Sequence, residues 1–323
     1  MSELIDAKPI FSFTRKGITE VVVHGIVALK NQGQPLVCPE ASTVIVTRSL
    51  LKPWQALATG GINSEHSYWA MGFASHSGQP QHMDQLKRFL ADTGASESSL
   101  VCPRSFPLDT NVAAEMRGVG SQASRLHHPC AGKHLLMLAA AIKEEAPIES
   151  YWHENHPIQK RIQALVGREA SEKLTWVTDS CGLPVAAMPV RALMNMYERL
   201  ALDGALPAKV LKELWTQNPK LVGGSRRLDT DLCEIGTGKL IAKEGADGLL
   251  MVQTLPDIGN QVTGCFVKIS SGHNTAHLGL ALWSLLSGRS DLTNALVTVR
   301  DYLRSRLEEW VPKDQVLEIL YKP

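Results

Sequence analysis

Residues 41–54 read ASTVIVTRSLLKPW, a β-branched run that leads directly into a helical pattern. The run predicts a strand over 41–46, and Pro53 falls early enough in the following helix to cost little. Ser49 and Lys52 stand at the join, and their three-residue spacing places both on one face of a helix. A neutral amine there can take the proton of the hydroxyl, so the stretch predicts acyl transfer. By spacing alone, a serine N-cap followed by a solvated lysine is the commoner meaning of this pattern.

Strand patterns occur near both ends of the chain, and helical patterns fill the middle. Strands are expected over 9–13, 20–28, 239–243, 248–254 and 264–269. Helices are expected over 49–59, 81–92, 111–119, 133–145, 158–168, 184–202, 207–218, 275–286 and 292–306. This order predicts an α+β protein whose terminal segments share one antiparallel sheet. We expect a single catalytic unit over 1–323, with a sheet lobe of 1–48 plus 220–323 and a helical lobe of 49–219.

Composition limits the classes of function. The chain has 323 residues, is 44% hydrophobic and 20% charged, and carries a net charge of +1, which describes a soluble globular protein. Basic residues number 33 against 32 acidic ones, and no basic run stands out. Nucleic acid and anionic membranes are therefore not expected as partners, whereas small molecules are.

The amino terminus and the cysteines indicate the cellular compartment. The first eight residues lack the basic start and apolar core of a secretory signal, and no apolar run approaches the ~18 residues of a membrane span. Six cysteines are spread through the chain, which without an export signal favours reduced thiols over a disulfide framework. A cytoplasmic location is expected.

Two cysteines begin helical patterns within polar clusters. Cys130 is followed by Lys133 and His134, and Cys181 follows Asp179 at a second helix start. Two such thiolates can converge on one zinc ion, although neither cluster has the stronger Cys-x-x-Cys spacing. The alternative is a pair of small buried hydrophobic residues beside surface histidines.

Three further positions each have two possible interpretations. Ser77, in the small polar loop 74–80, is either a second active-site serine or part of an ordinary turn that caps a helix. Arg227, in the glycine-rich stretch 222–230, is either part of a clamp for a substrate carboxylate or a residue of a mobile surface turn. Lys268, inside an apolar strand, either extends its amine to solvent or is deliberately desolvated.

Seven short motifs occur in a specific order. They are Arg-Ser-x-x-Lys-Pro (48–53), Ser-His-Ser-Gly (75–78), His-x-Cys-x-Gly-Lys-His (128–134), Asp-x-Cys-Gly-x-Pro (179–184), Gly-Gly-x-x-Arg-x-Asp-Thr (223–230), Lys-x-Gly-Ala-Asp-Gly (243–248) and the strand lysine at 268. Together, from about residue 10 to about residue 310, they resemble the class 3 or rhizobial-type L-asparaginases.

The resemblance implies hydrolysis of L-asparagine to L-aspartate and ammonia by a homodimer, on a fold similar to serine β-lactamases, penicillin-binding proteins and glutaminases. By position, the catalytic pairs are Ser49 with Lys52 and Ser77 with Lys268. Ser49 is the preferred nucleophile because its lysine is local, with Ser77 and Lys268 relaying protons, and an exchange of these roles stays open. The zinc ligands are Cys130, Lys133 and Cys181. The residues that match substrate-binding or flanking positions are Arg48, His134, Asp179, Arg227, Asp229 and Thr230.

One departure from the family concerns a further cysteine after the Lys-x-Gly-Ala motif, where this chain has Leu249, Leu250, Met251 and Val252. Three alternative functions stay open. A glutaminase differs by one methylene in its substrate, worth only ~1–3 kcal/mol of discrimination. A β-lactamase or peptidase would require Ser-Asp-Asn and Lys-Thr-Gly, and neither tripeptide occurs. A zinc-binding regulatory protein would need the two cysteines alone.

Overall fold

The computed structural model describes residues 7–36, 38, 40–256 and 261–321. The chain forms two compact units. The first comprises residues 1–45, 188–202 and 227–323, and the second comprises 46–187 and 203–226. The chain passes from one unit to the other within two strands, β3 (Val44–Val46) and β5 (Pro184–Pro189).

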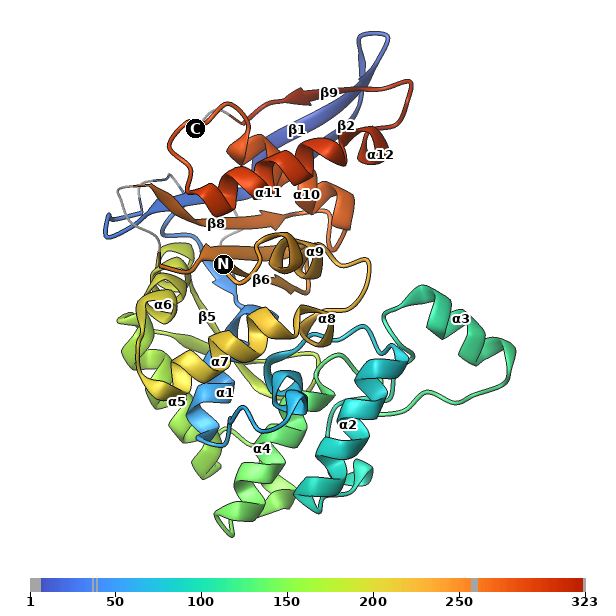
Figure 1. Ribbon diagram of the computed structural model, residues 1–323, viewed down its shortest axis with the longest axis vertical. Helices are drawn as coiled ribbons and strands as arrows, with labels where there is room; N and C mark the ends of the chain where they lie inside the picture. Colours follow the sequence, from blue (N-terminus) through green and yellow to red (C-terminus); the bar gives the residue numbers. More distant parts are fainter. Residues whose placement is uncertain (1–6, 37, 39, 257–260, 322–323) are drawn as a thin grey trace. The chain divides into compact units, whose positions relative to one another are not determined.

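The first unit is built on a six-stranded sheet, seen in Figure 1 as blue and orange arrows. Its strand order is β6-β7-β8-β2-β1-β9, and every neighbouring pair is antiparallel. The strands are β1 (Lys8–Arg15), β2 (Ile18–Asn31), β6 (Leu240–Gly245), β7 (Leu249–Thr254), β8 (Val262–Ile269) and β9 (Val316–Ile319). Strands from both ends of the chain therefore share one sheet, which confirms the predicted α+β class.

Helices cover this sheet. Helix α10 (Thr275–Leu286) packs on β1, β2 and β8, and helix α6 (Val190–Leu202) packs on β7 and β8. Helix α9 (Leu228–Ile235) lies against β6 and contacts α11 (Asn294–Ser305), which in turn contacts α12 (Leu307–Trp310). Strands β6 and β7 are buried along their whole length, so neither shows the alternation of apolar and polar residues that is typical of a half-exposed strand.

The second unit is mainly helical. It contains α1 (Lys52–Thr59), α2 (Pro80–Thr93), α3 (Thr110–Gly118), α4 (Ala131–Lys143), α5 (Pro157–Ala170), α7 (Leu206–Gln217) and α8 (Pro219–Val222). Four 3-10 helices interrupt it: η1 (Arg48–Leu51), η2 (Ser67–Phe73), η3 (Glu97–Ser99) and η4 (Ile148–Ser150). Strand β4 (Thr175–Thr178) pairs with β5 as an antiparallel hairpin. Among the described residues, no helix combines the length and apolar character that crossing a bilayer demands.

The helix expected over 184–202 is wrong in its first third. Residues Pro184–Pro189 form strand β5, and the helix begins only at Val190. All six strand residues are buried, so the run shows neither strand alternation nor a polar helix face. Periodicity cannot separate a fully buried strand from a buried helix in such a run. Strands β4 and β9 and helix α9 were not expected, because each is only four to eight residues long.

The start of helix α4 is fixed by a close contact. A Cβ added at Gly132 would lie 2.1 Å from the backbone oxygen of Met71 in η2, so only glycine allows this approach. We expect Gly132→Ala to destabilise the protein by about 1–3 kcal/mol, because backbone would have to move. Thermal unfolding of the purified variant measures this.

Gly167→Ala is the matched control, since it also lies in a helix of the second unit but has no atom within 4 Å of the added Cβ. It should stabilise the protein by roughly 0.5–1 kcal/mol. Equal unfolding temperatures for the Gly132→Ala protein and the unmodified protein would contradict this account of the helix contact.

Candidate active site

The Ser49 segment is a sharp turn between a strand and a helix, as the sequence predicts. Strand β3 ends at Val46, and Thr47 binds the backbone oxygen of Ala186 through both its amide (3.0 Å) and its hydroxyl (2.8 Å). Arg48 then adopts φ +48°, a left-handed conformation that costs a non-glycine residue roughly 1–2 kcal/mol. Such strain is retained where the fold holds it firmly, and it exposes part of the Ser49 side chain at the turn.

Lys52 is fully buried at the start of α1, and its amine is surrounded by three oxygens. Its Nζ lies 3.1 Å from the hydroxyl of Ser75 and 3.2 Å from the backbone oxygen of Pro129, and it also hydrogen-bonds the backbone oxygen of Ala74. The hydroxyl that bonds this amine is thus that of Ser75, whereas spacing had paired Lys52 with Ser49.

The three oxygens around Lys52 can serve either protonation state of its amine. The ammonium would donate one N–H group to each of them, including the Ser75 hydroxyl. The neutral amine has two N–H groups for the two carbonyl oxygens and one lone pair that can accept the proton of the Ser75 hydroxyl. Burial, opposed by Cys130 and reinforced by Lys133, lowers the pKa of Lys52, which favours the neutral form.

Ser77 is held by a glycine pair. Its amide and its hydroxyl both donate to the backbone oxygen of Gly223, at 2.9 and 3.0 Å. Gly224 follows with φ +137°, and a Cβ there would lie 2.5 Å from the Ser77 hydroxyl. Glycine at 224 is therefore required by its close approach to the loop that carries Ser75 and Ser77.

Two buried histidines keep that loop in place. His76 Nδ1 accepts the amide of Gly78 at 3.2 Å, and His82 Nδ1 accepts the amide of Gln79 at 3.0 Å. Both rings therefore carry their proton on Nε2, and that of His82 donates to the oxygen of Lys220 at 2.8 Å. Burial lowers the pKa of His76 well below its usual range, so the ring stays neutral.

The two predicted cysteine ligands come together in the second unit. Cys130 lies immediately before α4 and Cys181 lies in the β4–β5 hairpin loop; both are buried, and their thiol groups hydrogen-bond each other. That hydrogen bond, together with the positive charge of Lys133, lowers the pKa of Cys130 well below its usual value despite burial, and a protonated Lys52 would lower it further. The hydrogen bond to Cys130 and burial raise the pKa of Cys181 in turn. Cys130 is the thiolate of the pair.

Lys133 completes this cluster from the first turn of α4. Burial alone would lower the pKa of Lys133, but the sulfurs of Cys181 and Cys130 and the carboxylate of Asp179 together raise it. The two thiolate sulfurs suit zinc, whereas a lysine nitrogen is not among its usual ligands, so the assignment of Lys133 comes from the resemblance. Among the described residues no group of three His, Cys, Asp and Glu side chains could hold a metal, so any site here depends on the lysine.

Arg48 and Asp179 form an ion pair at one side of the cysteine cluster. Arg48 Nε lies 2.8 Å from Asp179 Oδ1, and its NH2 donates to Ser180 at 3.0 Å. His134, the neighbour of Lys133, accepts at Nδ1 from the Tyr151 hydroxyl at 2.6 Å, since that hydroxyl itself accepts the Val101 amide. The second unit thus brings together Arg48, Ser49, Lys52, Ser77, Cys130, Lys133, His134, Asp179 and Cys181 on neighbouring segments of one compact body.

The remaining predicted residues belong to the first unit. Arg227 is paired with Glu244 at 2.9 Å and lies 3.7 Å from Asp229, so its charge is already matched by two carboxylates. The Thr230 amide donates to Asp229. Lys268 is partly exposed and its Nζ donates to the oxygen of Asp247 at 2.9 Å, which corresponds to the solvent-directed alternative.

Three residues of these networks were not singled out from the sequence. Ser75 stands in the quoted Ser-His-Ser-Gly motif, but nothing in its spacing pairs it with Lys52. Lys243 and Glu244 open the Lys-x-Gly-Ala-Asp-Gly motif, and both are fully buried in β6. Two adjacent charged residues inside an otherwise apolar strand are the signal that could have marked them.

Comparisons place the chain in a family. No relative was found among the curated proteins compared with it. A comparison with protein-family models matches L-asparaginase II over residues 11–313, a span that includes every residue of the two networks described above. The chain therefore belongs to the L-asparaginase II family of amidohydrolases.

Proposed function

We propose that this chain hydrolyses the side-chain amide of L-asparagine to L-aspartate and ammonia, with neutral Lys52 as the general base. The observation that carries the proposal is the hydrogen-bond arrangement of Lys52, whose only hydroxyl partner is Ser75 among the residues that the structure describes. General bases work best when held in one geometry and protonation state before reaction. Family membership supports the amide as the bond cleaved.

The reaction proceeds in two halves. An attacking serine loses its proton to Lys52 and adds to the carboxamide carbon; the resulting ammonium of Lys52 then protonates the nitrogen, and ammonia leaves. Water attacks the acyl-enzyme with Lys52 again accepting the proton, which releases L-aspartate and the free serine. Ser75 is the serine placed for direct transfer, and Ser49 and Ser77 are its two competitors for the attacking role.

The Arg48–Asp179 pair matches the two charges of a free amino acid. A guanidinium binds an α-carboxylate through two parallel hydrogen bonds, and a carboxylate binds an α-ammonium. Arg48 and Asp179 neutralise each other at 2.8 Å before substrate binds. When the amino acid binds, its carboxylate pairs with Arg48 and its ammonium pairs with Asp179, so that no buried charge is left without a partner. This favours amino-acid amides over simple amides.

A zinc ion would be held by Cys130, Cys181 and Lys133. The two sulfurs suit the ion, and Lys133 must lose a proton to become a ligand, so affinity for zinc should increase with pH. When bound, zinc supplies a Lewis acid and a fixed positive charge next to the reaction site. The homodimer and the cytoplasmic location expected from the sequence stay predictions.

The experiment for the proposal is a coupled ammonia assay over L-asparagine, L-glutamine and simple amides. Lys52→Met should lower turnover of L-asparagine by about 10²- to 10⁴-fold, and Lys52→Arg should be as poor because guanidinium stays protonated. In the unmodified protein, the rate should fall as pH drops through the lowered pKa of Lys52, because protonation removes the lone pair. Unchanged turnover in Lys52→Arg would refute the assignment, and preference for glutamine would make the chain a glutaminase.

Gly224→Ala tests the position of the serine loop. The added Cβ would displace the Ser77 hydroxyl, so turnover should drop by about 10²-fold. Gly94→Ala is the control, since Gly94 has φ +67° in the same unit but no atom within 4 Å of an added Cβ. Full activity in Gly224→Ala with the same assay would show that the contact does not matter.

Cys130→Ser and Cys181→Ser test the zinc site. Each substitution should remove most of the zinc content of the purified protein, measured by elemental analysis, because a serine hydroxyl replaces a thiolate ligand. Cys102→Ser is the matched control, a buried cysteine of the same unit whose sulfur lies 3.6 Å from the oxygen of Arg125. Unchanged zinc content in both test variants would eliminate the site.

A further inference from the structure

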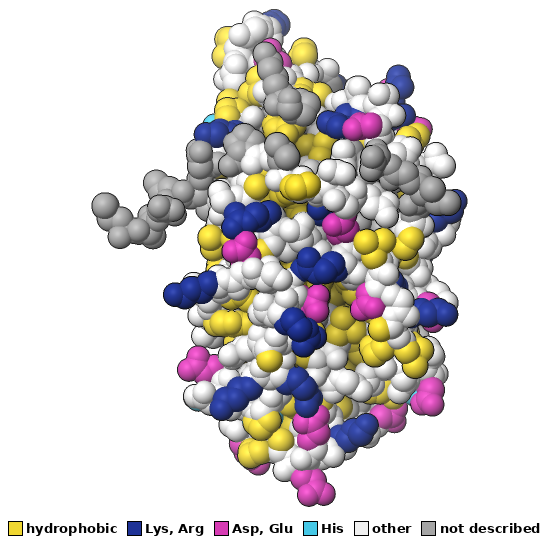
Figure 2. Space-filling view, turned by 90° about the vertical axis from the view of Figure 1, so that its left-hand side faces the viewer, with side chains coloured by type: hydrophobic (Ala, Val, Ile, Leu, Met, Phe, Trp, Pro, Cys, Tyr) yellow, Lys and Arg dark blue, Asp and Glu magenta, His cyan; other side chains and the backbone are white. Residues whose placement is uncertain are grey.

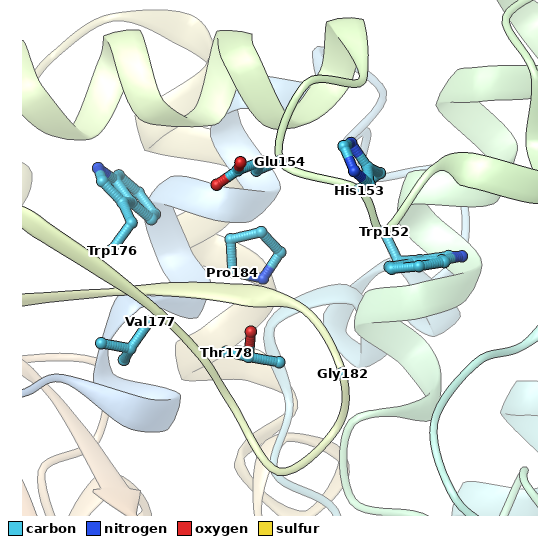
Figure 3. Close-up of a pocket in the computed structure, with 8 residues that line it drawn as sticks. All are labelled: Trp152, His153, Glu154, Trp176, Val177, Thr178, Gly182 and Pro184. Atoms are coloured by element: carbon cyan, nitrogen blue, oxygen red, sulfur yellow. The ribbon is translucent and has the colours of Figure 1, made fainter.

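A cavity of about 260 Å³ lies in the second unit, apart from the residues assigned above. The turn at 152–154, which follows η4, forms one wall, and the β4–β5 hairpin forms the other (Figure 3). Ligand pockets of proteins span roughly 300–1,000 Å³, so this cavity suits a ligand of only a few heavy atoms.

Two tryptophans line the cavity, and neither is fully buried. The side chain of Trp152 is 39% exposed, and its indole N–H donates to the oxygen of Glu149 at 3.1 Å, which fixes the ring. Trp176 lies on β4, the edge strand of its three-stranded sheet, and is partly exposed. Exposed aromatic side chains that line one cavity are typical of binding sites.

The lining has one acidic side chain and one histidine, Glu154 and His153, and both residues are exposed. Glu154 is the single acidic residue among the eight that line the cavity, and none of the eight is lysine or arginine. Its carboxylate has no ion pair or hydrogen bond with any residue that the structure describes. In Figure 3 this carboxylate points toward the Trp176 side of the cavity, above Pro184. A ring face and an unpaired carboxylate together attract a cation and repel an anion.

We propose that this cavity binds a small organic ammonium ion, seated against the Trp176 indole and the Glu154 carboxylate. One short turn, residues 178–182, connects this cavity to the residues assigned to the active site. Thr178 and Gly182 face the cavity, and the residues between them include Asp179 and Cys181. That turn is closed by hydrogen bonds from the Gly182 amide to Asp179 (2.8 Å) and from the Asp179 amide to Leu183 (2.9 Å).

The test compares choline with 3,3-dimethylbutan-1-ol, which has the same shape without the charge. Calorimetric titration of the full chain should show binding of choline and none of the neutral alcohol. Glu154→Gln should weaken choline binding about two- to fivefold, and Trp176→Leu about three- to tenfold. Glu308→Gln, an exposed carboxylate of the first unit, is the control and should bind choline normally.

Saturation-transfer NMR on the unmodified protein gives a second readout that needs no variant. Irradiation of the indole protons should transfer to the choline methyl groups and not to those of the alcohol. The proposal is overturned if choline does not bind, if both compounds bind equally, or if Glu154→Gln and Trp176→Leu bind choline as the unmodified protein does. Because binding is measured without substrate, these outcomes are independent of the asparaginase proposal.

Discussion

A lysine amine enclosed at the start of a helix is the constraint on which the rest of the site depends. Lys52 is fully buried, and a charged amine there would lack water. Two carbonyl oxygens and one hydroxyl replace that water, and burial lowers the pKa of Lys52, which favours the neutral amine. Burial of the amine and its contact with Ser75 are therefore the linked property on which the site depends.

The local fold of the second unit maintains this property. Gly132 allows the start of α4 to approach η2. Pro129 and Cys130 directly precede this helix, so the same contact helps to position them. On the other side, the oxygens of Val222 and Gly223 bind the amides of Ser75 and Ser77, which holds the serine loop in extended form. Gly132 and Gly224 thus each have a steric reason, which is separate from any chemistry that their neighbours perform.

Electrostatics link the lysine to the cysteine cluster. Lys133 lowers both the pKa of Cys130 and the pKa of Lys52, whereas the charge of Cys130 raises the pKa of Lys52. On the face drawn in Figure 2, basic and acidic side chains are interspersed.

Of the fold and the site, the sequence predicted much: the antiparallel sheet from both ends, the strand-to-helix turn at Ser49 and the meeting of Cys130 with Cys181. It could not predict the Lys52–Ser75 bond, because contacts across 23 residues depend on packing, nor the strand at 184–189, because uniform burial removes periodicity.

The most direct measurement replaces Lys52 with its analogue in which sulfur substitutes for the γ-methylene group. The analogue keeps the length and the amine but makes the amine more acidic. If neutral Lys52 is the base, the acidic limb of the pH dependence of kcat/KM for L-asparagine should shift to lower pH while activity is retained. An acidic limb at the same pH in both proteins would contradict the central claim, since the titrating group would then not be Lys52.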